Sequence, residues 1–112
     1  ANTFLNAKSD LTTTNLTTIY TTPSATTAVI KSILVSEDAG SGTTIDVTLV
    51  DASGTIFSLF KAKAVGSNTT VELLTQPLVL KESEALKAQA ADANELHIIA
   101  SILEVKPREV VT

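Results

Sequence analysis

The chain has 112 residues, a formal net charge of −4 and no cysteine. This length suits one domain with a core of its own, and the lack of cysteine excludes a disulfide framework, a zinc–thiolate site and a thiol nucleophile. Twelve acidic residues outnumber eight basic ones, so nucleic acid and anionic membrane surfaces are not expected as partners. No apolar run approaches the roughly 18 residues that a membrane-spanning helix requires.

Threonine is abundant, with eighteen residues, and the mean hydropathy is +0.28. Threonine is β-branched and favours strands. A positive hydropathy with few aromatic residues fits either apolar surface that is kept for a partner or simply a large aliphatic core. Composition alone leaves both interpretations open.

Residues 1–15 show no clear period and are expected to form an N-terminal arm. Phe4, Leu5 and Leu11 are its candidates for contact with a neighbouring subunit. The segment lacks the basic and then apolar pattern of a signal peptide, and Ala1 fits synthesis in the cytoplasm followed by removal of an initiator Met. Removing residues 1–11 is therefore expected to leave the domain folded.

From residue 16 onward, strand patterns alternate with turn signals. The clearest signal is a hairpin, in which Ile45, Val47 and Leu49 alternate with polar residues and residues 51–54 supply Asp and Gly for the turn. Residues 37–42 are expected to be a flexible polar loop. The expected strands in this part of the chain are residues 16–21, 27–36, 45–49, 55–63, 69–74 and 77–80.

Residues 82–103 carry two competing patterns. Residues 83–93 have high helix propensity, yet Leu86, Ala88 and Ala90 also alternate with polar residues. A turn at residues 92–94 and a second alternating run from Leu96 to Ile102 favour two strands over a helix.

The strand count is about eight, with spacing near ten residues, which is typical of an all-β sandwich or barrel. The prediction is an antiparallel β-sandwich, jelly-roll or immunoglobulin-like, over residues 16–105. Residues 106–112 are expected to leave the domain as a C-terminal tail, on which Val110 and Val111 could clamp a neighbour.

Catalytic chemistry finds little support in the residue pattern. His97 is the single histidine and falls on the more polar face of its strand, where a surface or interface role is expected because no nucleophile motif accompanies it. Glu37 and Asp38 lack the spacing of a calcium loop. No cofactor, metal site or enzymatic activity is predicted.

Two segments resemble small virion structural proteins of tailed bacteriophages, particularly marine and cyanobacterial phages. The first is residues 17–36, TTIYTTPSATTAVIKSILVS, and the second is residues 76–88, QPLVLKESEALKA, followed by a closing strand that ends in Leu103-Glu104-Val105. The shared features are a turn that places Pro three residues after Tyr and a late Pro-Leu-x-Leu segment.

This resemblance implies a capsid decoration or cement protein on the exterior of the phage head, where it would bind the major capsid protein or other virion proteins. Such a protein needs apolar contact area and many copies rather than catalysis. A homo-oligomer is expected, and a trimer is possible. A tail, neck or fibre subunit, or a receptor- or glycan-binding β-sandwich, remains as an alternative.

Overall fold

The computed structural model describes residues 2–107, and this part of the chain contains strands and loops but no helix, so no helix in it could cross a membrane. The choice of two strands over a helix near residue 88 is confirmed, because that residue lies in a strand. The nine strands are β1 (Asn2–Leu11), β2 (Thr17–Thr21), β3 (Thr27–Glu37), β4 (Thr43–Val50), β5 (Ile56–Val65), β6 (Thr70–Glu72), β7 (Leu78–Leu80), β8 (Ala85–Ala90) and β9 (Leu96–Val105).

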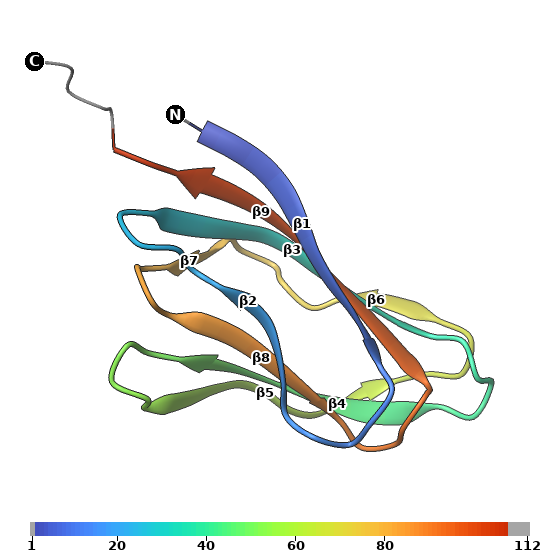
Figure 1. The fold of residues 1–112 in the computed structure, drawn as a ribbon. Coiled ribbons are helices and arrows are strands. Elements are labelled where there is room, and N and C mark those ends of the chain that lie inside the picture. Colours follow the sequence, from blue (N-terminus) through green and yellow to red (C-terminus); the bar gives the residue numbers. More distant parts are fainter. Residues whose placement is uncertain (1, 108–112) are drawn as a thin grey trace, which may run out of the picture.

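The strands form two antiparallel sheets that pack face to face (Figure 1). Sheet A has the order β1-β9-β3-β6, and β7 also pairs with β3; sheet B has the order β2-β8-β4-β5. Because β6 and β7 pair with two parts of the same strand, they together occupy one strand position. The predicted β-sandwich is confirmed. The eight positions, four in each sheet, are those of a jelly roll, in which β4 and β5 form a hairpin within sheet B and the other successive positions alternate between the sheets.

The core lies between the sheets and follows from the period-two pattern of the strands. In β9, Leu96, Ile98, Ala100 and Ile102 are buried while the residues between them are exposed or half-buried. Side chains alternate between the two faces of a strand, so an aliphatic residue at every second position is enough to build the inner layer. Ile45 and Val47 of β4 are buried in the same way from the other sheet.

The N-terminal segment differs from the expected arm. Residues 2–11 are the edge strand of sheet A and pair with β9 in ten consecutive positions without a register shift. Leu5, Ala7, Ser9 and Leu11 face the core side. The period was hard to see because small and polar residues occupy two of these inward positions and Phe4 occupies an outward one.

The loop after β3 also differs from the expected flexible polar loop. Glu37 is buried, and its carboxylate accepts hydrogen bonds from the backbone N–H groups of Gly40, Ser41, Gly42 and Asn68 at 3.0–3.2 Å. These bonds, led by that from Asn68, lower the pKa of Glu37 from 4.5 to about 2 although burial opposes the shift. The Glu37 carboxylate therefore holds two loops together, the loop between β3 and β4 and the loop between β5 and β6.

Candidate assembly surface

An apolar row crosses the outer face of sheet A. Phe4 of β1 lies opposite Leu103 of β9, Leu103 lies opposite Val29 of β3, and Val29 lies opposite Val79 of β7. Directly opposite residues in an antiparallel pair project from the same face. These four side chains, called the apolar row below, therefore form a continuous hydrophobic band from one edge of the sheet to the other.

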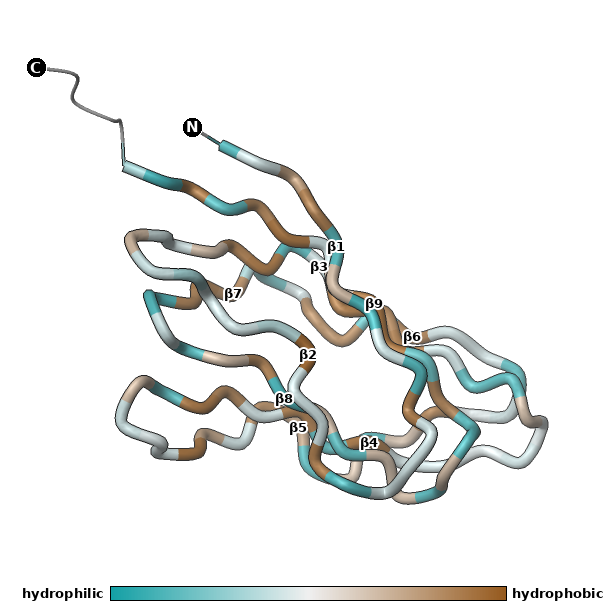
Figure 2. Tube along the Cα trace, viewed as in Figure 1, coloured by the Kyte–Doolittle hydropathy of each residue, from teal (hydrophilic) through white to brown (hydrophobic). Residues whose placement is uncertain are grey.

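The row is accessible mainly at its two ends. Phe4 is 74% exposed and Val79 is 54% exposed, whereas Leu103 and Val29 are half-buried between them. Val105, two residues beyond Leu103 on the same face, is also exposed. Figure 2 shows hydrophobic stretches on β1, β9 and β3, which are neighbours in this sheet.

A second apolar pair lies further along the same face. Ile99 of β9 lies opposite Leu34 of β3, and both side chains are partly exposed. A polar strip that includes Asn6, Ser101 and Ser32 separates this pair from the apolar row. The outer face of sheet A thus alternates apolar and polar rows. Its larger apolar part lies near the N-terminal end of β1 and the C-terminal end of β9.

The residues that the sequence suggested as partner contacts are scattered in the structure. Phe4 is exposed at one end of the apolar row, Leu5 is half-buried against the protein's own core, and Leu11 is only 1% exposed and belongs to that core. Val110 and Val111 lie outside the described residues. Of the three residues on β1, Phe4 is thus the one that offers a large free apolar surface.

Val29, Val79 and Leu103 were not singled out from the sequence. The available signal was that Val29 and Val79 lie in continuous apolar runs, residues 28–30 and 78–80, rather than in a clean alternation, while Leu103 directly follows Ile102. Such a run indicates a strand that is apolar on both faces. Their alignment with Phe4 depends on the strand register, which the sequence does not display.

The far end of this face is ionic. His97 Nε2 lies 3.3 Å from Asp10 Oδ1, and His97 Nδ1 lies 3.6 Å from Asp38 Oδ2. All three side chains are well exposed, as expected of a surface histidine. Among residues 2–107, no group of His, Cys, Asp and Glu side chains could hold a metal ion.

A buried hydrogen bond supports the sheet behind the apolar row. The hydroxyl of Tyr20 on β2 donates to Glu104 Oε2 on β9 at 2.6 Å, so it ties sheet B to sheet A. Burial, together with the hydrogen bond to the Glu104 carboxylate and its charge, raises the pKa of Tyr20. Glu104 directly follows Leu103 on β9 and points inward. Its hydrogen bond to Tyr20 therefore holds β9, the strand that carries Leu103 at the centre of the apolar row.

The outer face of sheet B carries two adjoining hollows instead of an apolar row. They have volumes of about 450 and 340 Å³ and share Asp46, Lys61 and Gln89 as lining residues. Asp46 accepts hydrogen bonds from Ala62 N–H and from Lys61 Nζ, and Gln89 donates to the carbonyl of Thr14. Neither hollow is lined by an aromatic side chain, the group on which sugar rings commonly stack.

No protein-family model matches this sequence, and no curated protein matches it either. Among solved structures, a chain of the Bacillus endospore appendages, which form a family of disulfide-linked pili, has a TM-score of 0.60 at 9% identity, with 96% of this chain and 88% of that chain covered. A chain of the capsid of Helicobacter pylori bacteriophage KHP30 has a TM-score of 0.58 at 10% identity, with 95% and 89% covered. At these identities the similarity is one of fold.

Proposed function

We propose that the protein is a non-enzymatic structural subunit of a bacteriophage virion, and specifically a decoration or cement protein on the outside of the head. The apolar row on sheet A is the observation that carries this proposal, because it offers a partner a hydrophobic band that crosses four paired strands. The resemblance of residues 17–36 and 76–88 to phage virion proteins supports the phage setting, and the jelly-roll fold shared with a KHP30 capsid chain is compatible with it.

The row would act as the contact with the major capsid protein. Burial of a large apolar side chain contributes about 1.5–3 kcal/mol before the costs of association, so a row with two strongly exposed members gives a weak single contact. Many copies held on one lattice, or several copies joined in a homo-oligomer, convert weak contacts into durable attachment. This argument requires neither a cofactor nor a catalytic residue.

Copy number in purified virions tests the assignment directly. Quantitative mass spectrometry against the major capsid protein should give hundreds of copies in a simple ratio to that protein. A few to a few dozen copies would instead assign the protein to the tail, neck or fibre, and absence from particles would overturn the virion proposal. Binding of the isolated protein to purified host surface polysaccharide would favour the receptor- or glycan-binding alternative.

A paired substitution tests the apolar row itself. We expect the double variant Phe4→Asp, Val79→Asp to bind heads that lack the native protein at least about tenfold more weakly, because each carboxylate must be desolvated on binding. Ile56→Asp is the matched control, since Ile56 is an exposed apolar residue, 59% accessible, on sheet B. Binding of the double variant equal to that of the control would exclude the row as the contact.

The exterior location has a test of its own. Protection of the protein from added protease on intact heads would contradict its location on the outside of the head.

A further inference from the structure

The free edge of β1 is unusual among the sheet edges of this molecule. β1 pairs with β9 on one side and has no strand on its other side within residues 2–107. It is ten residues long, contains no proline or glycine, and pairs with β9 without a bulge. A long, regular, uncovered edge is a template for another strand, and most proteins blunt such edges.

Every other edge in the described part of the chain is short or interrupted. β2 has five residues and a bulge between Thr18 and Tyr20. β5 has two register shifts against β4, with Ala62 at a positive φ of 50°. β6 and β7 have three residues each. The contrast within one molecule indicates that β1 is left open for pairing.

The orientation of the β1 backbone can be assigned from one hydrogen bond. The carbonyl of Leu11 accepts the N–H of Asn94, which lies two residues before the start of β9, so this carbonyl faces the β9 side. Backbone groups of successive strand residues point to alternate sides. The N–H and C=O groups of Phe4, Asn6 and Lys8, and the N–H of Asp10, therefore face the open side, where they are available to a new strand. The carbonyl of Asp10 already accepts the N–H of Thr12 at 2.9 Å.

We infer that β1 pairs antiparallel with β1 of a second copy of this chain, about a two-fold axis at Asn6. This register aligns residues 2–10 of one copy with residues 10–2 of the other, and it brings together the largest set of free backbone groups. It places Phe4 beside Lys8 of the partner subunit, a cation–π arrangement. Lys8 forms no ion pair within the described residues, so it is free to do this.

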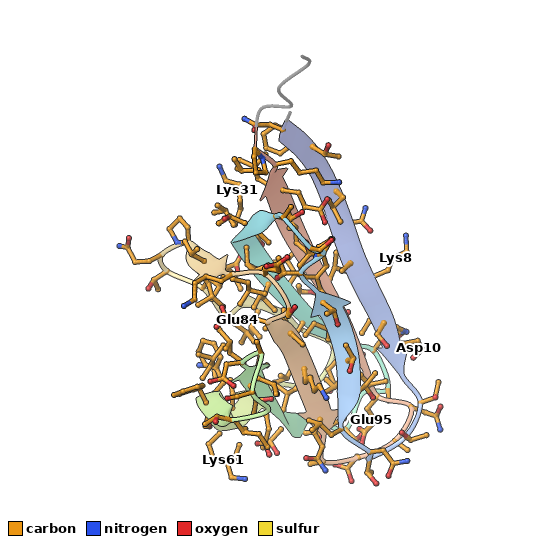
Figure 3. The ribbon with its side chains drawn as sticks, turned by 60° about the vertical axis from the view of Figure 1, so that its left-hand side comes forward. Lys8, Asp10, Lys31, Lys61, Glu84 and Glu95 are labelled. Carbon is orange, nitrogen blue, oxygen red and sulfur yellow. The ribbon has the colours of Figure 1, made fainter. Side chains whose placement is uncertain are left out.

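Neighbouring registers fit less well. A two-fold axis at Ala7 would set Phe4 against the carboxylate of Asp10 of the partner subunit, and axes at Phe4 or Lys8 would align fewer residues. Figure 3 shows Lys8 and Asp10 along the outer margin of β1, where no other strand covers them. The pairing uses the backbone edge of sheet A, whereas the proposed head contact uses its outer face. Phe4 takes part in both, and the substitutions of Asn6 described below leave its side chain in place.

Single-cysteine variants test both the pairing and its register, because the chain contains no cysteine. Opposed Cα atoms in an antiparallel pair lie about 4.5–5.5 Å apart, within disulfide range. We expect Asn6→Cys to form a dimer under mild oxidation at least about tenfold faster than Ser53→Cys, a matched variant in the exposed hairpin turn. Faster cross-linking of Phe4→Cys or Lys8→Cys than of Asn6→Cys, or rates equal to the Ser53→Cys control, would overturn the inference.

Sedimentation equilibrium of the unmodified chain gives an independent test. Asn6→Pro removes an N–H on the open side of β1 and spares the ladder with β9, as proline at a sheet edge can. We expect the wild-type chain to dimerise with rising concentration, Asn6→Pro to dimerise at least about tenfold more weakly, and Asn6→Thr, which keeps the N–H, to behave like wild type. A wild-type chain that stays monomeric up to about 1 mM, or an oligomer that a folded Asn6→Pro variant leaves intact, would contradict β1 pairing.

Discussion

Carboxylates that accept backbone hydrogen bonds hold the loops and one strand irregularity of this molecule: Glu37 is buried and Glu72 is exposed. Glu37 holds two loops through four backbone N–H groups. Glu72 accepts from the N–H groups of Ile33 and Leu74 at 2.8 and 3.1 Å, next to the bulge at Ile30/Ser32 of β3. In a chain without cysteine, and so without disulfides, such carboxylates provide the local constraints that loops need.

A pH dependence of stability follows from Glu37 at the residue scale. Its pKa falls from 4.5 to about 2 on folding, so the folded state binds fewer protons and the stabilisation is present above pH 4.5. It is lost as the pH falls from about 4.5 to about 2. We expect the thermal midpoint of the wild-type chain to drop over this range.

The variant Glu37→Gln checks the assignment to this residue. It should be less stable at neutral pH, and its midpoint should depend less on pH below about 4.5, because an amide does not titrate there. Some dependence should remain, since hydrogen bonds from Ser53 and Thr55 also lower the pKa of Asp51. The check is differential scanning calorimetry of both chains from neutral to acidic pH, and parallel curves would contradict the role of Glu37.

At the scale of the element, β1 contributes both to the core of the sandwich and to the surface that is available to partners. Its inward residues belong to the sandwich, since Leu11 is fully buried and Leu5 packs against the core, while its outward side chains and free backbone edge remain available to partners. The expectation that residues 1–11 can be removed without harm rested on treating them as an arm. Because they form a strand that covers β9, their removal acts on the fold as well as on assembly.

We therefore expect a chain that lacks residues 1–11 to be severely destabilised. It loses the burial of Leu11, worth about 1.5–3 kcal/mol, and uncovers the edge of β9 together with part of the core beneath Leu5. Urea unfolding should show a loss of at least about 3 kcal/mol. Phe4→Ser is the control, since an exposed side chain should change stability by no more than about 0.5 kcal/mol. Equal stabilities of the truncated and full-length chains would show that β1 is dispensable.

At the scale of the whole molecule, the topology joins the first and last strands of the described chain, β1 and β9. Asn2 pairs with Val105, and β3 pairs with β9 over its whole length. Sheet A therefore cannot be completed until the last strand is available. The same closure places both ends of the described chain beside the apolar row, so fold completion and the proposed assembly surface depend on the same strands.

Folding kinetics should reflect this closure. Long-range pairing requires loop closure before contacts can form, and all-β sandwiches fold in about milliseconds to seconds. We expect stopped-flow refolding in this range, with a single unfolding transition because both sheets share one core. Two separate unfolding transitions would mean that the sheets are independent units.

The strand positions could be predicted from the sequence because period two depends only on neighbouring residues. Ile45, Val47 and Leu49 indicated β4, and the alternation through Leu96 and Ile102 indicated β9. The turn at residues 51–54 was likewise local, since Asp51 caps it with hydrogen bonds to the N–H groups of Ser53 and Thr55. The alternating polar positions near residue 88 favoured a strand over a helix, and the structure decided for the strand.

The assembly surface, in contrast, was decided by tertiary structure. Phe4 and Val79 are 75 positions apart in the sequence, and they share a row only because β1, β9, β3 and β7 pair in one register. Two buried contacts depend on long-range packing in the same way. Glu37 is bound by the N–H of Asn68 from a distant loop, and Tyr20 of sheet B donates to Glu104 of sheet A. Local periodicity determined what each strand is, and long-range strand pairing decided which side chains meet, because register is set by the packing of both sheets around a common core.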